Sequence, residues 1–266
     1  MERIELARTI AKEAGNLTLR YFNDPTLEVE RKNDGTPVTI ADKGAEELLR
    51  FRIAEMFPED TILGEEYPEK EGDSGWRWIL DPIDGTKSFI HGVPLYSTLI
   101  GIEHEGNPVA GIIWIPPLGE GIWAQRGEGA WAIHPKLQKP VEAHVSDVRD
   151  LADALFLTSE VITFDQVGRR PLYNEVERRC RLTRTWGDAY GYYLVATGRA
   201  DIMIDPDLSD WDAGPLLTVM QEAGGCFTDW RGVATISGKE GVATNALLFD
   251  QTIELTRRFP KRIRDI

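Results

Sequence analysis

The chain of 266 residues carries 30 Lys plus Arg against 44 Asp plus Glu, which gives a formal net charge of −14 at pH 7. Its 42% apolar content and eight tryptophans exclude a disordered protein, because such a composition needs a packed interior. The acid excess argues against a general binder of nucleic acid or anionic membranes, which would repel it, and leaves open whether some carboxylates gather to hold cations.

Residues 1–143 are predicted to form an α+β domain in which helices precede an antiparallel meander. Apolar residues at helical spacing predict helices over 3–22 and about 42–57, the second ended by Pro58. Apolar runs bounded by turn residues predict five strands, joined in the meander by turns at 105–108 and 126–129. These strands are expected at 76–80, 97–104, 109–115, 121–125 and 131–134.

A second domain is predicted over residues 144–266, because strands and helices alternate from about residue 145. The basic, proline-containing stretch 134–141 marks the boundary. Strands are expected at 154–158, 181–185, 200–204 and 225–229, and helices at 164–179, 188–197, 212–223 and 245–259. This rhythm favours a more parallel second sheet, and the whole chain is expected to be layered α and β.

Targeting, disulfide and zinc signals are absent from the sequence. The first residues mix charges of both signs, and no run reaches the ~18 apolar residues that a membrane span needs. Cys180 and Cys226 are expected to be buried thiols in a reducing cytoplasm. The four histidines form no paired motif. The basic run 257–264 is expected to be a solvated tail rather than a nucleic-acid site.

Carboxylates gather in the segment 81–86, directly after the predicted strand 76–80. Asp81 ends an apolar strand, where a buried carboxylate is costly unless it is neutralised. Pro82 stiffens the following turn, and the Asp84 carboxylate is expected to lie next to that of Asp81. Taken alone, each residue also suits an ordinary strand end or turn. Together, two carboxylates and the Ile83 carbonyl form a set of hard oxygens that favours Mg²⁺ or Mn²⁺ over zinc.

An anion site is expected next to this cation site. Gly85 and Thr86 open a short predicted helix, whose amino-terminal N–H groups and dipole favour negative charge. A cation site that touches an anion site is what phosphoryl chemistry requires.

Four ordered motifs resemble the inositol monophosphatase family of Mg²⁺-dependent, lithium-sensitive phosphatases. The resemblance runs from the first helix to about Phe249 and implies the layered α-β-α-β-α sandwich of the inositol monophosphatase and fructose-1,6-bisphosphatase type. The motifs are the segment 32–42, Gly64-Glu65-Glu66, Asp81-Pro82-Ile83-Asp84-Gly85-Thr86 and Trp211-Asp212-Ala213-Gly214.

The resemblance implies a set of metal ligands. Glu65, Asp81 and the Ile83 carbonyl would hold a first Mg²⁺. Asp81, Asp84 and Asp212 would hold a second, with Asp81 as the bridge. Glu65, with waters, could support a weaker third ion, so two or three ions are expected per active site.

The resemblance also implies residues that act around the metals. Asp42 and Thr86 would form a hydrogen-bonded pair that orients the attacking, metal-activated water. The N–H groups of Gly85 and Thr86 would receive the phosphate. Glu66 would lie beside Glu65, and Lys32 near the metal loop would balance charge.

Substrate selection is expected to lie in the second half of the chain. The segment 184–201 resembles the histidinol-phosphatase branch of the family, since inositol-type enzymes usually have Gly-Thr-Ala where this chain has Gly187-Asp188-Ala189. Asp205 also stands where those enzymes commonly have Glu. Both carboxylates would pair with a cationic substrate, although Asp188 also suits a helix cap and Asp205 the turn at Pro206.

The sequence therefore predicts a cytoplasmic, Mg²⁺-dependent phosphomonoesterase that acts on L-histidinol phosphate in histidine biosynthesis. Inositol-1-phosphate or a broad range of sugar phosphates is the main alternative. A phosphatase of 3′-phosphoadenosine 5′-phosphate and a non-catalytic binding protein remain further alternatives. The resemblance implies a homodimer, with the aromatic, apolar segment 112–123 as its expected contact surface.

Overall fold

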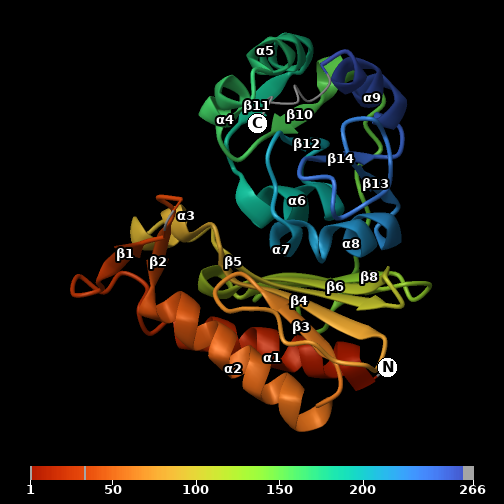
Figure 1. Cartoon of the computed structure of the whole chain (residues 1–266). Helices are drawn as coiled ribbons and strands as arrows, with labels where there is room; N and C mark the ends of the chain where they lie inside the picture. The colour runs from red at the N-terminus through yellow and green to blue at the C-terminus, as the bar shows by residue number, and fades with distance from the viewer. Residues whose placement is uncertain (1, 33, 260–266) are drawn as a thin grey trace.

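The computed structural model describes residues 2–32 and 34–259. Its elements stack in five layers, from helices α1 and α2 at one end to α4, α5 and α9 at the other (Figure 1). This is the α-β-α-β-α sandwich that the sequence predicts. Asn33 of the upstream motif and residues 260–264 of the basic run lie outside the described residues.

The first layer consists of α1 (Glu2–Thr18) and α2 (Ile40–Met56), which pack on one face of the first sheet. Helix α1 ends at Thr18, short of the predicted residue 22, and the chain then turns through Asn23 in the left-handed conformation. Helix α2 begins two residues earlier than predicted because Thr39 is its N-cap. The Thr39 hydroxyl accepts a hydrogen bond from Ala41 N, and the Asp42 carboxylate accepts one from Thr39 N.

The second layer is a seven-stranded sheet in the order β3-β4-β5-β6-β7-β8-β9. Strands β3 and β4 are parallel, and every other neighbouring pair is antiparallel. Its strands are β3 (Thr61–Gly64), β4 (Trp76–Asp84), β5 (Ser97–His104), β6 (Asn107–Ile115), β7 (Glu120–Gln125), β8 (Ala130–Ile133) and β9 (Val141–Glu142). A separate ribbon pairs β1 (Val29–Arg31) with β2 (Pro37–Thr39), and a 3-10 turn spans Pro116–Leu118.

The sequence reading missed the two edge strands β3 and β9, and two further predictions for this sheet need correction. The turn between β5 and β6 is shorter than the predicted 105–108: it contains only Glu105 and Gly106, both with positive φ, as two-residue hairpins prefer. Strand β4 does not end at Leu80 but continues to Asp84, with an irregular register between Asp81 and Asp84 against β5. The metal motif is therefore a distorted strand end rather than a free turn.

The second sheet has the order β11-β10-β12-β14-β13. Strand β10 is parallel to β11 and β12, whereas β14 is antiparallel to β12 and β13, so the sheet is mixed. The sequence reading missed β14. The strands are β10 (Leu155–Leu157), β11 (Leu182–Arg184), β12 (Ile202–Asp205), β13 (Gly225–Thr228) and β14 (Gly241–Asn245).

Helices cover both faces of the second sheet. The predicted helix 164–179 is two helices that meet near Gly168, which has positive φ, and the predicted helix 212–223 is divided at Gly214-Pro215. The outer layer holds α4 (Val161–Gln166), α5 (Arg170–Arg179) and α9 (Phe249–Arg257), and a 3-10 turn spans Leu151–Asp153. Between the sheets lie α6 (Asp188–Ala196), α7 (Asp210–Ala213) and α8 (Leu216–Glu222), and α3 (Thr86–Ile90) follows β4 (Figure 1).

The central helix layer packs against both sheets in one shared apolar core, which includes Leu99, Ile113, Leu157, Met203 and Val219. Because this core joins both halves of the chain, the division into domains 1–143 and 144–266 stays a prediction. Among the described residues, none of the helices is both long and apolar enough to cross a bilayer.

Glycines on the first sheet let the central helices approach closely. Gly101 of β5 and Gly111 of β6 are directly paired. A Cβ at residue 101 would lie 2.5 Å from the carbonyl carbon of Gly214, and one at residue 111 would lie 2.4 Å from the carbonyl oxygen of Pro215. This contact seats the segment that follows α7 on the sheet and so brings α7 to the end of β4.

We expect Gly111→Ala to lower the free energy of unfolding by about 1–3 kcal/mol, the range typical of overpacking. The matched control is Gly44→Ala on α2, where the added Cβ would be 3.7 Å from Leu17 Cδ2. Because alanine favours a helix interior, the control should gain about 0.5–1 kcal/mol. Denaturant titration measures both values. Equal stability of the two variants would contradict the proposed close contact.

Candidate metal centre and substrate pocket

The irregular end of β4 brings two carboxyl groups to one place. Asp81 and Asp84 are both buried, at 1% and 7% exposure. Asp81 Oδ1 accepts a hydrogen bond from Ile83 N at 3.1 Å. Asp84 Oδ2 accepts one from Ser97 Oγ at 3.0 Å and one from Ala189 N at 2.6 Å. These contacts fix both side chains on the side of the strand that faces the central helices.

Asp212 reaches the same place from the second half of the chain. It lies in the first turn of α7, where its Oδ2 accepts a hydrogen bond from N of the N-cap residue Ser209 at 2.7 Å. Asp81, Asp84 and Asp212 each offer a carboxylate oxygen, and these oxygens all lie within 4.8 Å of one another. The structure therefore brings together three of the expected metal ligands. Asp212 lies 131 positions after Asp81 in the sequence.

Glu65 and Glu66 flank this cluster after β3. The Lys32 ammonium bridges them, at 2.7 Å from Glu65 Oε1 and 2.8 Å from Glu66 Oε1, which confirms the expected charge balance. Residue 64 has to be glycine, because a Cβ there would lie 2.0 Å from Oε1 of the buried Glu46. The other Glu46 oxygen accepts the Glu66 N–H at 2.7 Å, so Glu46 positions the loop that carries both glutamates.

Asp42 and Thr86 meet beside the cluster, as the sequence reading expects. Thr86 Oγ1 lies 3.3 Å from Asp42 Oδ1 and 3.0 Å from the Ile83 carbonyl oxygen. Thr39 donates to the other Asp42 oxygen through both its N–H, at 2.7 Å, and its hydroxyl, at 2.6 Å. The cap of α2 thus holds the Asp42 carboxylate in one orientation toward Thr86.

The amino terminus of α6 borders the site on the side that faces the second sheet. Asp188 has φ = +53°, a left-handed conformation that is uncommon outside glycine. Its N–H donates to Ser159 Oγ at 2.8 Å, and the next amide, of Ala189, donates to Asp84. Gly85 packs against it, since a Cβ there would be 2.8 Å from Asp188 Oδ2. The strained turn that begins at Gly187 therefore links α6 directly to the metal cluster.

Asp205 needs a revised interpretation. The sequence reading expects it to contact substrate, but it is 2% exposed at the end of β12 and is surrounded by donors. Thr158 Oγ1 and Ser159 N donate to Oδ1 at 3.1 and 2.8 Å, whereas Ser159 Oγ and Tyr192 OH each donate to Oδ2 at 3.0 Å. Because four hydrogen bonds occupy its oxygens, Asp205 orients Ser159 behind the Asp188 turn instead of facing the pocket.

The acidic cluster is electrostatically unfavourable without a cation. Burial raises the pKa of Asp42 to about 6, and burial also raises the pKa of Asp212 to about 6. Burial raises the pKa of Glu65 to about 7, although Lys32 acts in the opposite direction. Burial and the neighbouring carboxylates raise the pKa of Asp81 well above its usual range. Each shift reflects the cost of an ionised group that lacks sufficient positive charge nearby.

The ligand set fits a hard divalent cation. All the available donors are oxygens, and the buried carboxyl groups of Asp81 and Asp84 lie close enough to the half-buried one of Asp212 to share an ion. Such a set suits Mg²⁺ or Mn²⁺ better than softer metals. A cavity of about 390 Å³ opens onto these groups and onto Gly85 and Thr86.

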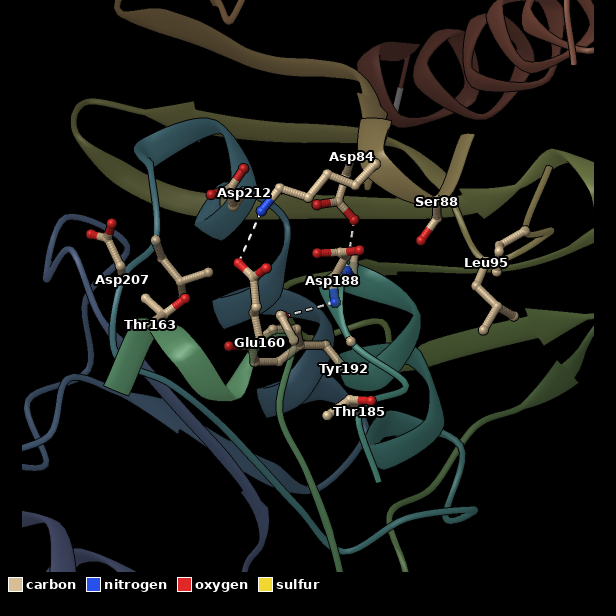
Figure 2. Close-up of a pocket in the computed structure, with 16 residues that line it drawn as sticks. Asp84, Ser88, Leu95, Glu160, Thr163, Thr185, Asp188, Tyr192, Asp207 and Asp212 are labelled. Carbon is tan, nitrogen blue, oxygen red and sulfur yellow. Dashed lines mark hydrogen bonds and ion pairs between the residues drawn. The ribbon is translucent and has the colours of Figure 1, made fainter. Parts of the chain in front are cut away.

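A second cavity, of about 340 Å³, adjoins the cluster and shares Asp84, Asp188 and Asp212 with the first (Figure 2). Gly187 and Ala189 line it as expected. Lys87 and Glu160 also line it, and the sequence reading missed both. One signal could have indicated Glu160, because it follows the carboxyl end of a predicted strand in an alternating β/α segment, where ligands commonly bind.

Comparison with known proteins agrees with this geometry. Residues 1–260 match the sequence model of the inositol monophosphatase family. A protein from Chlorobaculum parvum named histidinol-phosphatase is 43% identical over 246 residues, which cover 92% of this chain and 93% of that relative. A histidinol-phosphatase from Mycobacterium tuberculosis is 38% identical over 248 residues, covering 93% and 95% of the two chains. Among solved structures, the extragenic suppressor protein SuhB from Bartonella henselae superposes with a TM-score of 0.88 at 28% identity and covers 98% and 100% of the two chains.

The raised pKa values predict how pH affects the metal-free protein. Unfolded carboxyl groups have a pKa near 4, so between about pH 4 and 7 the native state binds more protons than the unfolded state. Stability without metal should therefore fall as pH rises through this range. We expect Mg²⁺ to raise the melting temperature of chelator-treated protein more at pH 8 than at pH 5. A shift of equal size at both pH values, measured by calorimetry, would contradict the placement of cations among these groups.

Proposed function

The chain belongs to the inositol monophosphatase family, and from this premise we propose that it is a phosphoric monoester hydrolase that converts L-histidinol phosphate into L-histidinol and phosphate. The observation that carries the reaction type is the cluster of Asp81, Asp84 and Asp212 beside the Asp42–Thr86 pair. The substrate choice is supported by the histidinol-phosphatases that match nearly the whole chain. The step belongs to histidine biosynthesis.

The family is metal-dependent, and the acidic cluster could bind metal. We propose two or three Mg²⁺ ions, with Mn²⁺ as the alternative, held by Glu65, Asp81, Asp84, Asp212 and the Ile83 carbonyl. Bound cations would supply positive charge to the reacting phosphate and lower the pKa of a water.

The chain's own residues orient the reactants. With the Ile83 carbonyl taken by a cation, the Thr86 hydroxyl would direct its one proton to Asp42 Oδ1 and so present a lone pair to the attacking water. Thr39 keeps the Asp42 carboxylate in this orientation. The N–H groups of Gly85 and Thr86, at the start of α3, hold the phosphate oxygens for attack in line with the leaving group.

We also propose that the enzyme is a cytoplasmic homodimer. The absence of a disulfide at Cys180 and Cys226, both free thiols, is compatible with a reducing compartment. The expected contact surface at residues 112–123 stays a prediction. Ile113, Ile115 and Ile122 are fully buried within the chain, so a partner would meet the half-buried Trp114, Leu118 and Trp123.

Asp84→Asn tests the metal assignment. The Asn carbonyl oxygen can still accept the hydrogen bonds from Ser97 and Ala189, so the fold should survive. We expect kcat to fall more than about 100-fold, beyond the 10- to 100-fold loss typical of groups that only support a ligand. Removal of one buried charge should also raise the melting temperature of the metal-free protein at pH 8. Activity close to wild type would contradict the assignment.

A substrate panel tests the proposed specificity. We expect phosphate release with Mg²⁺ to show a higher kcat/KM for L-histidinol phosphate than for inositol-1-phosphate, fructose-1,6-bisphosphate or 3′-phosphoadenosine 5′-phosphate. The acidic cavity wall at Glu160 and Asp188 is the physical reason, because it favours a cationic leaving group over a neutral polyol. A higher value for the inositol ester would refute the substrate while leaving the reaction type intact. Binding without hydrolysis of any ester would favour a non-catalytic protein.

A further inference from the structure

The cavity beside the acidic cluster is lined by more acidic than basic residues. Its charged lining residues include one base, Lys87, and several acids. Two of the acids, Asp84 and Asp212, belong to the cluster that would hold cations. The remaining acids are Glu160, Asp188 and Asp207, so three carboxyl groups face a single ammonium in the part of the pocket beyond the metals.

Lys87 and Glu160 form an ion pair across this cavity. Lys87 Nζ lies 2.9 Å from Glu160 Oε2, and the two residues are 73 positions apart in the sequence. Lys87 belongs to α3, which follows the metal motif, whereas Glu160 is the N-cap of α4 on the second sheet. Figure 2 shows Glu160 and Asp188 gathered around the same pocket, with a dashed line from Glu160 to its partner.

Another cation can replace Lys87 beside Glu160 at little cost, because both side chains of this ion pair are exposed to solvent. The Lys87 side chain is 65% exposed and that of Glu160 is 47% exposed. Exposed pairs of this kind add little to stability because water solvates both partners well. The Glu160 side chain does not cap α4, so its carboxylate is free to take another cation.

Each half of the pair lies beside one end of the expected substrate. Lys87 lines both the metal-site cavity, next to Gly85 and Thr86 where phosphate is expected, and the adjoining cavity. Glu160 lines only the adjoining cavity, where the alcohol portion of the ester would lie. A phosphate ester with a nearby ammonium group carries the same two charges as the pair itself.

We propose that the Lys87–Glu160 ion pair selects phosphate esters with a positively charged nitrogen close to the ester, because such a substrate replaces the pair. Glu160 binds the substrate ammonium, and the released Lys87 binds the phosphate. An ester of a neutral alcohol supplies an anion for Lys87 but leaves Glu160 without a cation. This inference rests on the proposed function and assigns its amine selectivity to a residue pair outside the metal cluster.

The test compares two substrates that differ only in the amino group: L-histidinol phosphate and 3-(imidazol-4-yl)propyl phosphate. Glu160→Gln removes the charge but keeps the size of the side chain. We expect it to raise KM for histidinol phosphate about tenfold, with kcat little changed, since Glu160 lines only the cavity expected for the alcohol portion. KM for the deamino ester should stay the same or fall. The ratio of the two kcat/KM values should therefore drop about tenfold.

Two further variants complete the design. Lys87→Gln should raise KM for both esters, since it removes a phosphate contact, and should keep the preference for the amine. Asp165→Asn is the matched control: Asp165 lies on the same helix α4 and forms a similarly exposed ion pair with Arg170. It should leave the ratio unchanged.

The outcomes separate this inference from the proposed function. A wild-type enzyme that prefers histidinol phosphate, together with an unchanged ratio in Glu160→Gln, overturns the role of the ion pair alone. An equal fall of the ratio in Glu160→Gln and Asp165→Asn also overturns it, because the effect would then be a general one of surface charge. A wild-type enzyme that does not hydrolyse histidinol phosphate overturns the proposed substrate, and the inference with it.

Discussion

Crowding of carboxyl groups at the end of β4 is the constraint on which the rest of the site depends. Asp81, Asp84 and Asp212 lie within 4.8 Å of one another, and burial raises the pKa of each. A protein interior does not stabilise such a group of like charges on its own. The fold nevertheless holds them together through the distorted β4, the α7 cap and the glycine contact at Gly111, which indicates that a cation completes the site.

The same excess of carboxyl groups continues into the adjoining cavity, where we propose that it selects the substrate. Asp205, Ser159 and Tyr192 form a hydrogen-bond network that holds the amino terminus of α6, and this places the Ala189 amide on Asp84. Asp188 and Glu160 then present carboxyl groups to the cavity. One short turn at the start of α6 therefore joins the acidic cluster to the cavity proposed for substrate selection.

The carboxylate cluster was predictable from the sequence because Asp81, Asp84 and Asp212 stand in short motifs whose order and spacing are specific. The substrate pocket was not, since it depends on contacts between distant segments. The sequence shows that Asp205 stands where related enzymes commonly have a Glu. Only the structure shows that Ser159 and Tyr192 donate hydrogen bonds to its oxygens. Glu160 carries no motif, and folding alone brings it to Lys87. Five short strands (β1, β2, β3, β9 and β14) and the divisions of two helices were missed, because short elements and glycine breaks give weak periodicity.

A crystal structure with Mn²⁺ and histidinol phosphate bound to Asp84→Asn would test the central claim most directly. Anomalous scattering locates Mn²⁺ independently of the protein atoms. The account predicts anomalous density beside Asp81 and Glu65, weakened or absent density beside residue 84, and the substrate ammonium at Glu160. Metal density away from these carboxylates, or a substrate amine directed away from Glu160 with the Lys87 pair intact, would contradict it.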